Sequence, residues 1–252
     1  MKVMDKNVCF GLIVATRGFF NPVLAGTARK ELLELLDELS IEYVIGSENA
    51  TPHGTVETLE HAKIYAKLFR ENAERIDGVL VILPNFGDEL GVVQTLDMAK
   101  LNVPVLVQAC KDELDKVGVF SRRDAFCGKL SVCNNLYQYN IPFTDTTFHT
   151  CDIKSQAFRD DLDRFSRICR TVKGLTNARI GAIGTRPAAF QTVRYSEKLL
   201  QSAGITIVPV DLSEIFAAAN AFDNGAAQVQ EKLDAIRAVS YTHLTLPTTL
   251  CM

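Results

Sequence analysis

The sequence lacks the features that mark several common classes of protein. Its 252 residues include no Trp, and Lys and Arg (27) do not outnumber Asp and Glu (30), so the formal net charge is −3. A nucleic-acid-binding protein usually needs a basic excess to neutralise phosphates, so we expect no nucleic-acid partner. The apolar run at residues 8–15 is too short to span a membrane and is followed by no small-residue cleavage site. We therefore expect a cytoplasmic protein without a membrane partner.

Clustered cysteines and the usual catalytic motifs are also missing. The seven Cys residues form no Cys-x-x-Cys pair, which favours reduced thiols that behave as small buried hydrophobes. The group formed by His149, Cys151 and Asp152 is too tight to supply several ligands to one ion, so we expect no metal site. The chain has no G-x-G-x-x-G, Walker or G-x-S-x-G pattern, which argues against a nucleotide cofactor and a serine hydrolase.

What the sequence does contain is an alternation of strand and helix patterns. Continuous apolar runs bounded by turns predict strands that are buried on both faces, and amphipathic segments between them predict helices. The predicted strands are 8–15, 42–46, 78–83 and 103–108, and the predicted helices are 22–39, 55–76, 88–100 and 152–173. This order predicts an α/β fold with a doubly wound parallel sheet of the Rossmann or flavodoxin type over residues 1–175. Residues 111–120 are predicted as loop, and residues 122–139 show a mixed pattern.

The same alternation starts again after residue 175. It predicts strands at 179–183 and 205–209 and helices at 187–203, 213–220 and 225–238. Residues 176–238 are therefore interpreted as the first two βα units of a second α/β domain.

The last 14 residues, 239–252, differ from the rest of the chain. They carry no charge and four Thr residues, and the stretch 240–249 resembles translated adapter sequence from a sequencing library. Such segments are excluded from fold reasoning, so we interpret 239–252 as a non-native tail on a native part that is truncated at residue 238. The alternative is a native polar edge strand.

Candidate binding residues follow the predicted strands of the first domain. Ligands of open α/β sheets bind at the carboxyl ends of the strands. Arg17 follows the first strand, Asn85, Asp88 and Glu89 follow the third, and Gln108 ends the fourth. We predict these five as substrate-binding residues, with Arg17 as a planar donor for a carboxylate, phosphate or polyol. The alternatives are a helix cap for Asp88 and a solvated loop charge for Arg17.

The order of these strands, helices and polar segments resembles the N-terminal part of the L-fucose/L-arabinose isomerase family. The resemblance rests on residues 15–18, 83–89, 124–135, 179–184 and 208–214, and it covers nearly all of residues 7–238. It implies that Arg17 is the family's N-terminal arginine that contacts substrate.

The resemblance further implies a metal-dependent aldose–ketose isomerase. In the family, a divalent metal, usually Mn²⁺, holds two neighbouring sugar oxygens while two carboxylates move a proton through an ene-diol. The metal ligands lie in later parts of the family's chains, and nothing in this sequence matches them. We therefore expect no catalytic and no metal-binding residue here, and an inactive fragment. The resemblance also implies a homo-oligomer in which Arg17 acts on a neighbouring subunit's substrate.

Two other functions are compatible with the sequence. One is a sugar-binding module like a periplasmic binding protein or the effector domain of a repressor. The other is an α/β fragment that binds a protein partner and no ligand. Fold analogy alone does not separate these from an isomerase.

Overall fold

The structure is a computed structural model that describes residues 8–118, 120–223 and 225–243. It divides into two compact units, Met1–Thr176 and Asn177–Met252. The first unit carries the predicted binding residues.

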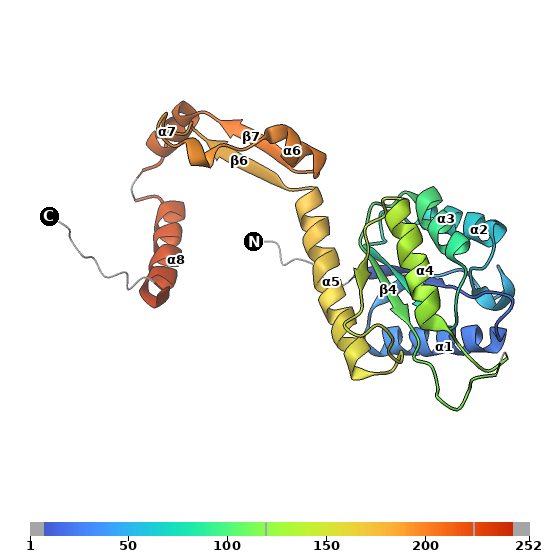
Figure 1. Cartoon of the computed structure of the whole chain (residues 1–252). Helices are drawn as coiled ribbons and strands as arrows, with labels where there is room; N and C mark the ends of the chain where they lie inside the picture. The colour runs from blue at the N-terminus through green and yellow to red at the C-terminus, as the bar shows by residue number, and fades with distance from the viewer. Residues whose placement is uncertain (1–7, 119, 224, 244–252) are drawn as a thin grey trace. The chain divides into compact units, whose positions relative to one another are not determined.

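The first unit is built on a parallel sheet of five strands, shown in Figure 1. The strands are β1 (Cys9–Val14), β2 (Glu42–Val44), β3 (Gly78–Leu83), β4 (Val105–Ala109) and β5 (Thr144–Asp145). Their order is β2-β1-β3-β4-β5. This is the flavodoxin-like order, in which the chain reverses its direction of winding between β1 and β3. The predicted doubly wound α/β fold is confirmed.

Helices cover both faces of this sheet. They are α1 (Pro22–Glu38), α2 (Leu59–Glu71), α3 (Glu89–Ala99), α4 (Ala125–Gln138) and α5 (Gln156–Thr176). Leu32 of α1 and Phe158 of α5 belong to one buried apolar cluster, while Phe69 of α2, Val92 of α3 and Leu136 of α4 belong to the other. Because both faces are covered, β1 and β3 are buried at every residue, which explains why they read as continuous apolar runs.

The start of α2 corrects the sequence prediction of a helix from residue 55. Thr55 lies beyond a short 3₁₀ turn (Pro52–Gly54), and its hydroxyl donates to the Pro52 carbonyl at 2.8 Å. Val56 forms a parallel bridge with Ala15, so the chain is extended there. Thr58 is the N-cap instead, because its hydroxyl accepts from the His61 amide at 3.2 Å.

Helix α4 lies in the segment 122–139, where the mixed sequence pattern predicted no definite helix. Its buried residues include Val132 and Leu136, but Leu130 and Tyr137 on the outer face are exposed and also apolar. Because apolar residues lie on both faces, the amphipathic period is weak. The short strand β5 was also not predicted, since two residues show no alternation.

The second unit holds a sheet of two parallel strands, β6 (Arg179–Ile183) and β7 (Thr206–Val210). Its helices are α6 (Glu197–Ser202), α7 (Leu212–Asn220) and α8 (Ala227–His243). The predicted helix 187–203 is wrong before residue 197, because a 3₁₀ turn (Gln191–Val193) precedes Ser196, whose hydroxyl caps α6. Helix α8 continues past residue 238, so 239–243 are helical backbone, while residues 244–252 of the predicted tail lie outside the described residues.

None of the helices in the described part of the chain has the length and apolar character that crossing a membrane requires.

Candidate functional site

The candidate site lies where β1 and β3 end side by side. Val14 pairs with Ile82 in the sheet, and the Ala15 amide still donates to the Ile82 carbonyl at 2.9 Å. Beyond this point the two strands diverge. The backbone continues into one segment after Ala15 and another after Leu83. Because the winding of the sheet reverses between these strands, a crevice for ligands is expected at this edge.

A buried hydrogen bond joins the two segments. The Asn85 side-chain amide donates to the Thr16 hydroxyl at 2.9 Å, and its Oδ1 accepts from the Gly87 amide at 3.1 Å. Asn85 is fully buried, and Gly87 has a φ of +72°, a conformation that favours glycine. Asn85 therefore fixes the backbone path of both segments. Its side-chain amide makes its hydrogen bonds within the protein.

Arg17 is held beside an aromatic ring and a carboxylate. Its Cζ lies 4.7 Å from the centre of the Phe86 ring, a cation–π distance, and its Nε lies 3.9 Å from Asp88 Oδ2. The exposed fractions of the Arg17 and Asp88 side chains are 38% and 20%. Arg17 is thus oriented by its neighbours and still offers donors to solvent.

Asp88 performs two tasks at once. Its Oδ1 accepts from the Gly91 amide at 2.8 Å and caps α3, which is the structural alternative considered for this residue. Its other oxygen faces Arg17. The cap and the ion pair are therefore compatible, because each uses a different carboxylate oxygen.

Aromatic rings and a second arginine extend the site. The Phe20 and Phe86 rings are stacked with centres 5.9 Å apart, and Arg122 Cζ lies 5.9 Å from the centre of the Phe20 ring. Arg17, Phe86, Phe20 and Arg122 form a layered arrangement of two guanidinium groups around two rings. The sequence analysis missed Arg122, because the loop after β4 shows no periodic pattern.

Arg123 ties the same loop to the end of β3. One terminal nitrogen donates to the Pro84 carbonyl at 3.0 Å, and the other lies 3.4 Å from Glu113 Oε1. In the sequence, this contact is signalled only by two adjacent arginines just after the predicted loop 111–120. Arg123 therefore supports the loop that carries Arg122.

Gly128 of α4 permits close packing against the site. A Cβ atom built on Gly128 would lie 1.6 Å from the Phe86 carbonyl oxygen, far inside van der Waals contact. Only glycine therefore allows α4 to support the ring beneath Arg17 in this position.

The remaining two predicted residues make their hydrogen bonds with residues other than Arg17. Glu89, in the first turn of α3, accepts a hydrogen bond from the Ser131 hydroxyl of α4. Gln108 is fully buried, donates to the Cys151 carbonyl at 2.6 Å, and has no hydrogen-bond partner for its Oε1 among the residues that the structure describes. A direct contact of Gln108 with a ligand stays a prediction.

The thiol next to Gln108 is not a candidate nucleophile. Burial raises the pKa of Cys110 to about 11, so the thiol is protonated at neutral pH. Four of the described cysteines are buried as expected, but Cys127 is exposed and Cys133 is half-buried, which corrects the expectation for these two residues.

The described residues do not fit a bound metal. Over residues 8–118, 120–223 and 225–243, no three His, Cys, Asp or Glu side chains come close enough together to hold an ion. The acidic residues of the candidate site, Asp88 and Glu89, are used by the α3 cap and by Ser131.

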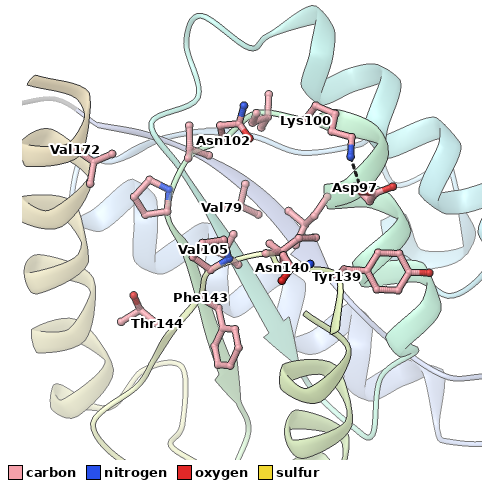
Figure 2. A pocket seen from close by; sticks show the side chains of 16 residues that line it. Val79, Asp97, Lys100, Asn102, Val105, Tyr139, Asn140, Phe143, Thr144 and Val172 are labelled. Atoms are coloured by element: carbon pink, nitrogen blue, oxygen red, sulfur yellow. Dashed lines mark hydrogen bonds and ion pairs between the residues drawn. The ribbon is translucent and has the colours of Figure 1, made fainter. Parts of the chain in front are cut away.

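A separate pocket opens at the opposite edge of the sheet (Figure 2). Its volume is about 450 Å³, and its lining includes Val79, Val105, Ile141 and Phe143. Lys100 and Asp97, both in this lining, form an ion pair at 2.6 Å. Most of its lining residues are apolar, although Asn102, Asn140 and Thr144 also line it, and its Lys100 is already paired with Asp97.

Comparison with known proteins gives a consistent result for the first unit. Residues 11–176 match the family model described as fucose/sulfoquinovose isomerase, N-terminal domain. The chain is also similar to the sulfoquinovose isomerases of Priestia aryabhattai and Priestia megaterium (strain ATCC 12872 / QMB1551). Each is 28% identical over 204 residues, which cover 80% of this chain and 44% of the relative. The match therefore spans less than half the length of these relatives.

Proposed function

The chain belongs to the fucose/sulfoquinovose isomerase family, and we propose that it is the substrate-contacting N-terminal part of an aldose–ketose isomerase. The family model covers residues 11–176, which include the ends of β1 and β3 and the whole candidate site. The proposal therefore assigns sugar binding to this edge of the sheet.

One observation carries the assignment. The Arg17 guanidinium is oriented by the Phe86 ring and the Asp88 carboxylate at the point where the sheet reverses its winding, and it stays partly exposed. A guanidinium is always protonated and donates along fixed directions, so Arg17 would bind and orient a sugar oxygen without transferring a proton. Asp88, the other partly exposed group, would accept from a sugar hydroxyl.

The other predicted residues take supporting roles in this proposal. Asn85 is a positioning residue, because its amide holds Thr16 and Gly87 in place. Glu89 lies at the same rim and would reach a ligand through the oxygen that does not accept from Ser131. Gln108 would reach a ligand only through its unpartnered Oε1.

The proposed substrate is a hexose or pentose of the kind that the family name indicates. The relatives are named for sulfoquinovose, a sulfonated sugar, and a guanidinium suits both a sulfonate and a row of hydroxyls. L-Fucose and L-arabinose follow from the resemblance of the sequence motifs. The geometry at Arg17 supports this set of sugars as a class.

The metal and the assembly also belong to this proposal. The family resemblance implies Mn²⁺, but the described residues do not fit a metal ion, so its ligands would come from other residues of the enzyme. We likewise propose a homo-oligomer in which Arg17 reaches a neighbouring subunit's substrate. This chain alone is expected to bind sugar without converting it.

Saturation-transfer NMR on the 252-residue chain tests the binding assignment. We expect saturation transfer to sulfoquinovose, L-fucose or L-arabinose, and its loss in Arg17→Ala. Arg167→Ala is the matched control, because Arg167 is an exposed arginine of α5 paired with Asp163. Equal transfer in wild type and Arg17→Ala would contradict the assignment.

A chimera separates an isomerase from a sugar-binding module. Residues 1–176 would replace the corresponding N-terminal part of the Priestia megaterium enzyme. We expect ketose formation in the presence of Mn²⁺, reduced by Arg17→Ala. A folded chimera that binds sugar but forms no ketose would favour the binding module instead.

A further inference from the structure

Glu57 lies at the candidate site, although it is far from the predicted binding residues in the sequence. The Val56 amide donates to the Val14 carbonyl at 2.8 Å, and the Thr16 amide donates to the Val56 carbonyl at 3.1 Å. The next residue, Glu57, is therefore held beside the segment that follows β1. The sequence gave no sign of this placement, because residues 55–76 were predicted as one continuous helix.

The Glu57 carboxylate lies against the backbone of Gly18. A Cβ atom built on Gly18 would lie 2.5 Å from Glu57 Oε1. The φ of Gly18 is not positive, so the missing side chain matters here for the space that it leaves to the carboxylate. Gly18 directly follows Arg17, which places Glu57 beside the segment that carries the proposed sugar contact.

The backbone of Glu57 is fixed on two sides, while its carboxylate is not used by the fold. The Glu57 amide donates to His61 Nδ1 at 3.3 Å, and a Cβ atom built on Gly91 would lie 3.2 Å from the Glu57 carbonyl carbon. Glu57 thus packs on the same turn of α3 that Asp88 caps. The side chain is half-buried, and over residues 8–118, 120–223 and 225–243 its carboxylate makes no hydrogen bond or ion pair.

The charges around the site favour a hydroxyl group over an anion. Its three guanidinium groups are each paired with a carboxylate. The pairs are Arg17 with Asp88, Arg122 with Asp124 and Arg123 with Glu113, at N–O distances of 3.9, 3.0 and 3.4 Å. Glu57 adds a carboxylate beyond these three pairs. A sulfonate would meet this additional negative charge, whereas a hydroxyl would donate a hydrogen bond to it.

We propose that Glu57 is a further substrate-contacting residue, whose carboxylate accepts a hydrogen bond from a sugar hydroxyl held at Arg17. A hydroxyl both donates and accepts, whereas a guanidinium only donates and a carboxylate only accepts. Arg17 and Glu57 together therefore satisfy both functions of the sugar hydroxyls. This inference rests on the proposed sugar site, and it assigns the hydroxyl-bearing part of the sugar to Arg17, with any sulfonate bound elsewhere.

NMR titration of the 252-residue chain with L-fucose tests the role of Glu57. The Kd should rise by about tenfold or more in Glu57→Ala, because a hydrogen bond to a charged group is lost. Glu60→Ala is the matched control, since Glu60 is a nearby exposed glutamate that pairs with Lys63. Methanesulfonate, a sulfonate without hydroxyls, should not displace L-fucose. Displacement by methanesulfonate would overturn the assignment of hydroxyls to this position.

Gly18→Ala moves the carboxylate without removing it. The Kd should again rise, while the melting temperature should stay near that of wild type, because the methyl group meets only the end of a flexible side chain. Monodeoxy analogues of L-fucose then separate a direct contact from a structural role. For at least one analogue, the affinity that wild type loses relative to L-fucose should be smaller in Glu57→Ala.

The outcomes distinguish this inference from the proposed function. If Arg17→Ala abolishes sugar binding but Glu57→Ala and Gly18→Ala bind L-fucose as wild type does, the role of Glu57 is overturned and the sugar site stands. The role of Glu57 is also overturned if every deoxy analogue loses the same affinity in Glu57→Ala as in wild type. If wild type binds no sugar, or Arg17→Ala binds it equally well, the proposed sugar site fails and the inference fails with it.

Discussion

The Asn85 side-chain amide donates to the Thr16 hydroxyl at 2.9 Å, although 69 residues separate them in the chain. The bond joins the segments that leave β1 and β3, and both side chains are buried. Arg17 directly follows Thr16 and Phe86 directly follows Asn85, so this bond sets the distance between the guanidinium and the ring.

Replacing Asn85 should therefore weaken both the fold and the site. In Asn85→Ala the buried Thr16 hydroxyl and the Gly87 amide lose their partner, which should lower the free energy of unfolding by about 1–3 kcal/mol. Urea unfolding measures this change. Asn134→Ala, an exposed position on α4, should stay within about 0.5 kcal/mol of wild type. If the two substitutions lowered the free energy of unfolding equally, the Asn85 hydrogen bonds would contribute nothing to stability.

Two Gly→Ala substitutions in helices of the same unit should have opposite effects. Gly128→Ala places a methyl group against the Phe86 carbonyl and should cost about 3 kcal/mol or more, with displacement of the Phe86 ring. Gly26→Ala in α1 meets no atom nearer than 3.8 Å and should stabilise by about 0.5–1 kcal/mol. Thermal unfolding of the two variants compares them directly. A Gly128→Ala protein as stable as wild type would mean that α4 does not pack on Phe86 as described.

Two ion pairs that join α1 to α5 and to the segment just before it should make stability depend on pH. The hydrogen bond and charge of Lys154 lower the pKa of Glu34, and those of Arg159 lower the pKa of Glu38. A lowered carboxyl pKa adds stability above the unfolded-state pKa, and this is lost as the pH falls through the folded-state pKa.

The double variant Glu34→Gln, Glu38→Gln should therefore melt below wild type at neutral pH. The difference should shrink as the pH falls through the ordinary range of glutamate, and it should disappear below the lowered folded-state pKa values, where both proteins lack the charges. High salt should also reduce it, because the pairs are exposed. If the difference in melting temperature persisted unchanged at acid pH, its cause would be packing instead of charge.

Cysteine reactivity should follow exposure and pKa. A brief pulse of N-ethylmaleimide at mildly alkaline pH should label Cys127, which is exposed, well before Cys110 and Cys169. Burial raises the pKa of the latter two to about 11 and about 12, so few thiolates form. Peptide mass spectrometry reads the order of labelling, and Cys251 lies outside the described residues. Equal labelling of Cys110 and Cys127 in the folded protein would contradict the burial of β4's carboxyl end.

Those parts of the fold with a strong local signal were predictable from sequence. The predicted strand 78–83 coincides with β3, because six consecutive buried apolar residues have no competing interpretation. That Arg17 and Asp88 lie close together could be predicted, because a parallel sheet brings the carboxyl ends of its strands to one edge. That Asp88 both caps α3 and faces Arg17 required the structure, since each role uses a different oxygen.

The remaining features depend on contacts that no local pattern encodes. Arg122 lies beside Phe20 in a loop that Arg123 ties to Pro84, a contact between segments far apart in the sequence. Gln108 could have been interpreted more cautiously from strand alternation, because it shares a sheet face with Leu106, which is part of a buried cluster. Helix α4 was missed because its outer face is apolar as well as its inner one.

The position of the sugar on the first unit tests the central claim most directly. Backbone amide shifts of the isotope-labelled chain would be followed during titration with sulfoquinovose and with L-fucose. The account predicts saturable shifts at Arg17, Phe86 and Asp88, at the ends of β1 and β3. Shifts confined to Lys100, Asn102 and Ile141 in the pocket at the opposite edge, or no shifts with either sugar, would contradict it.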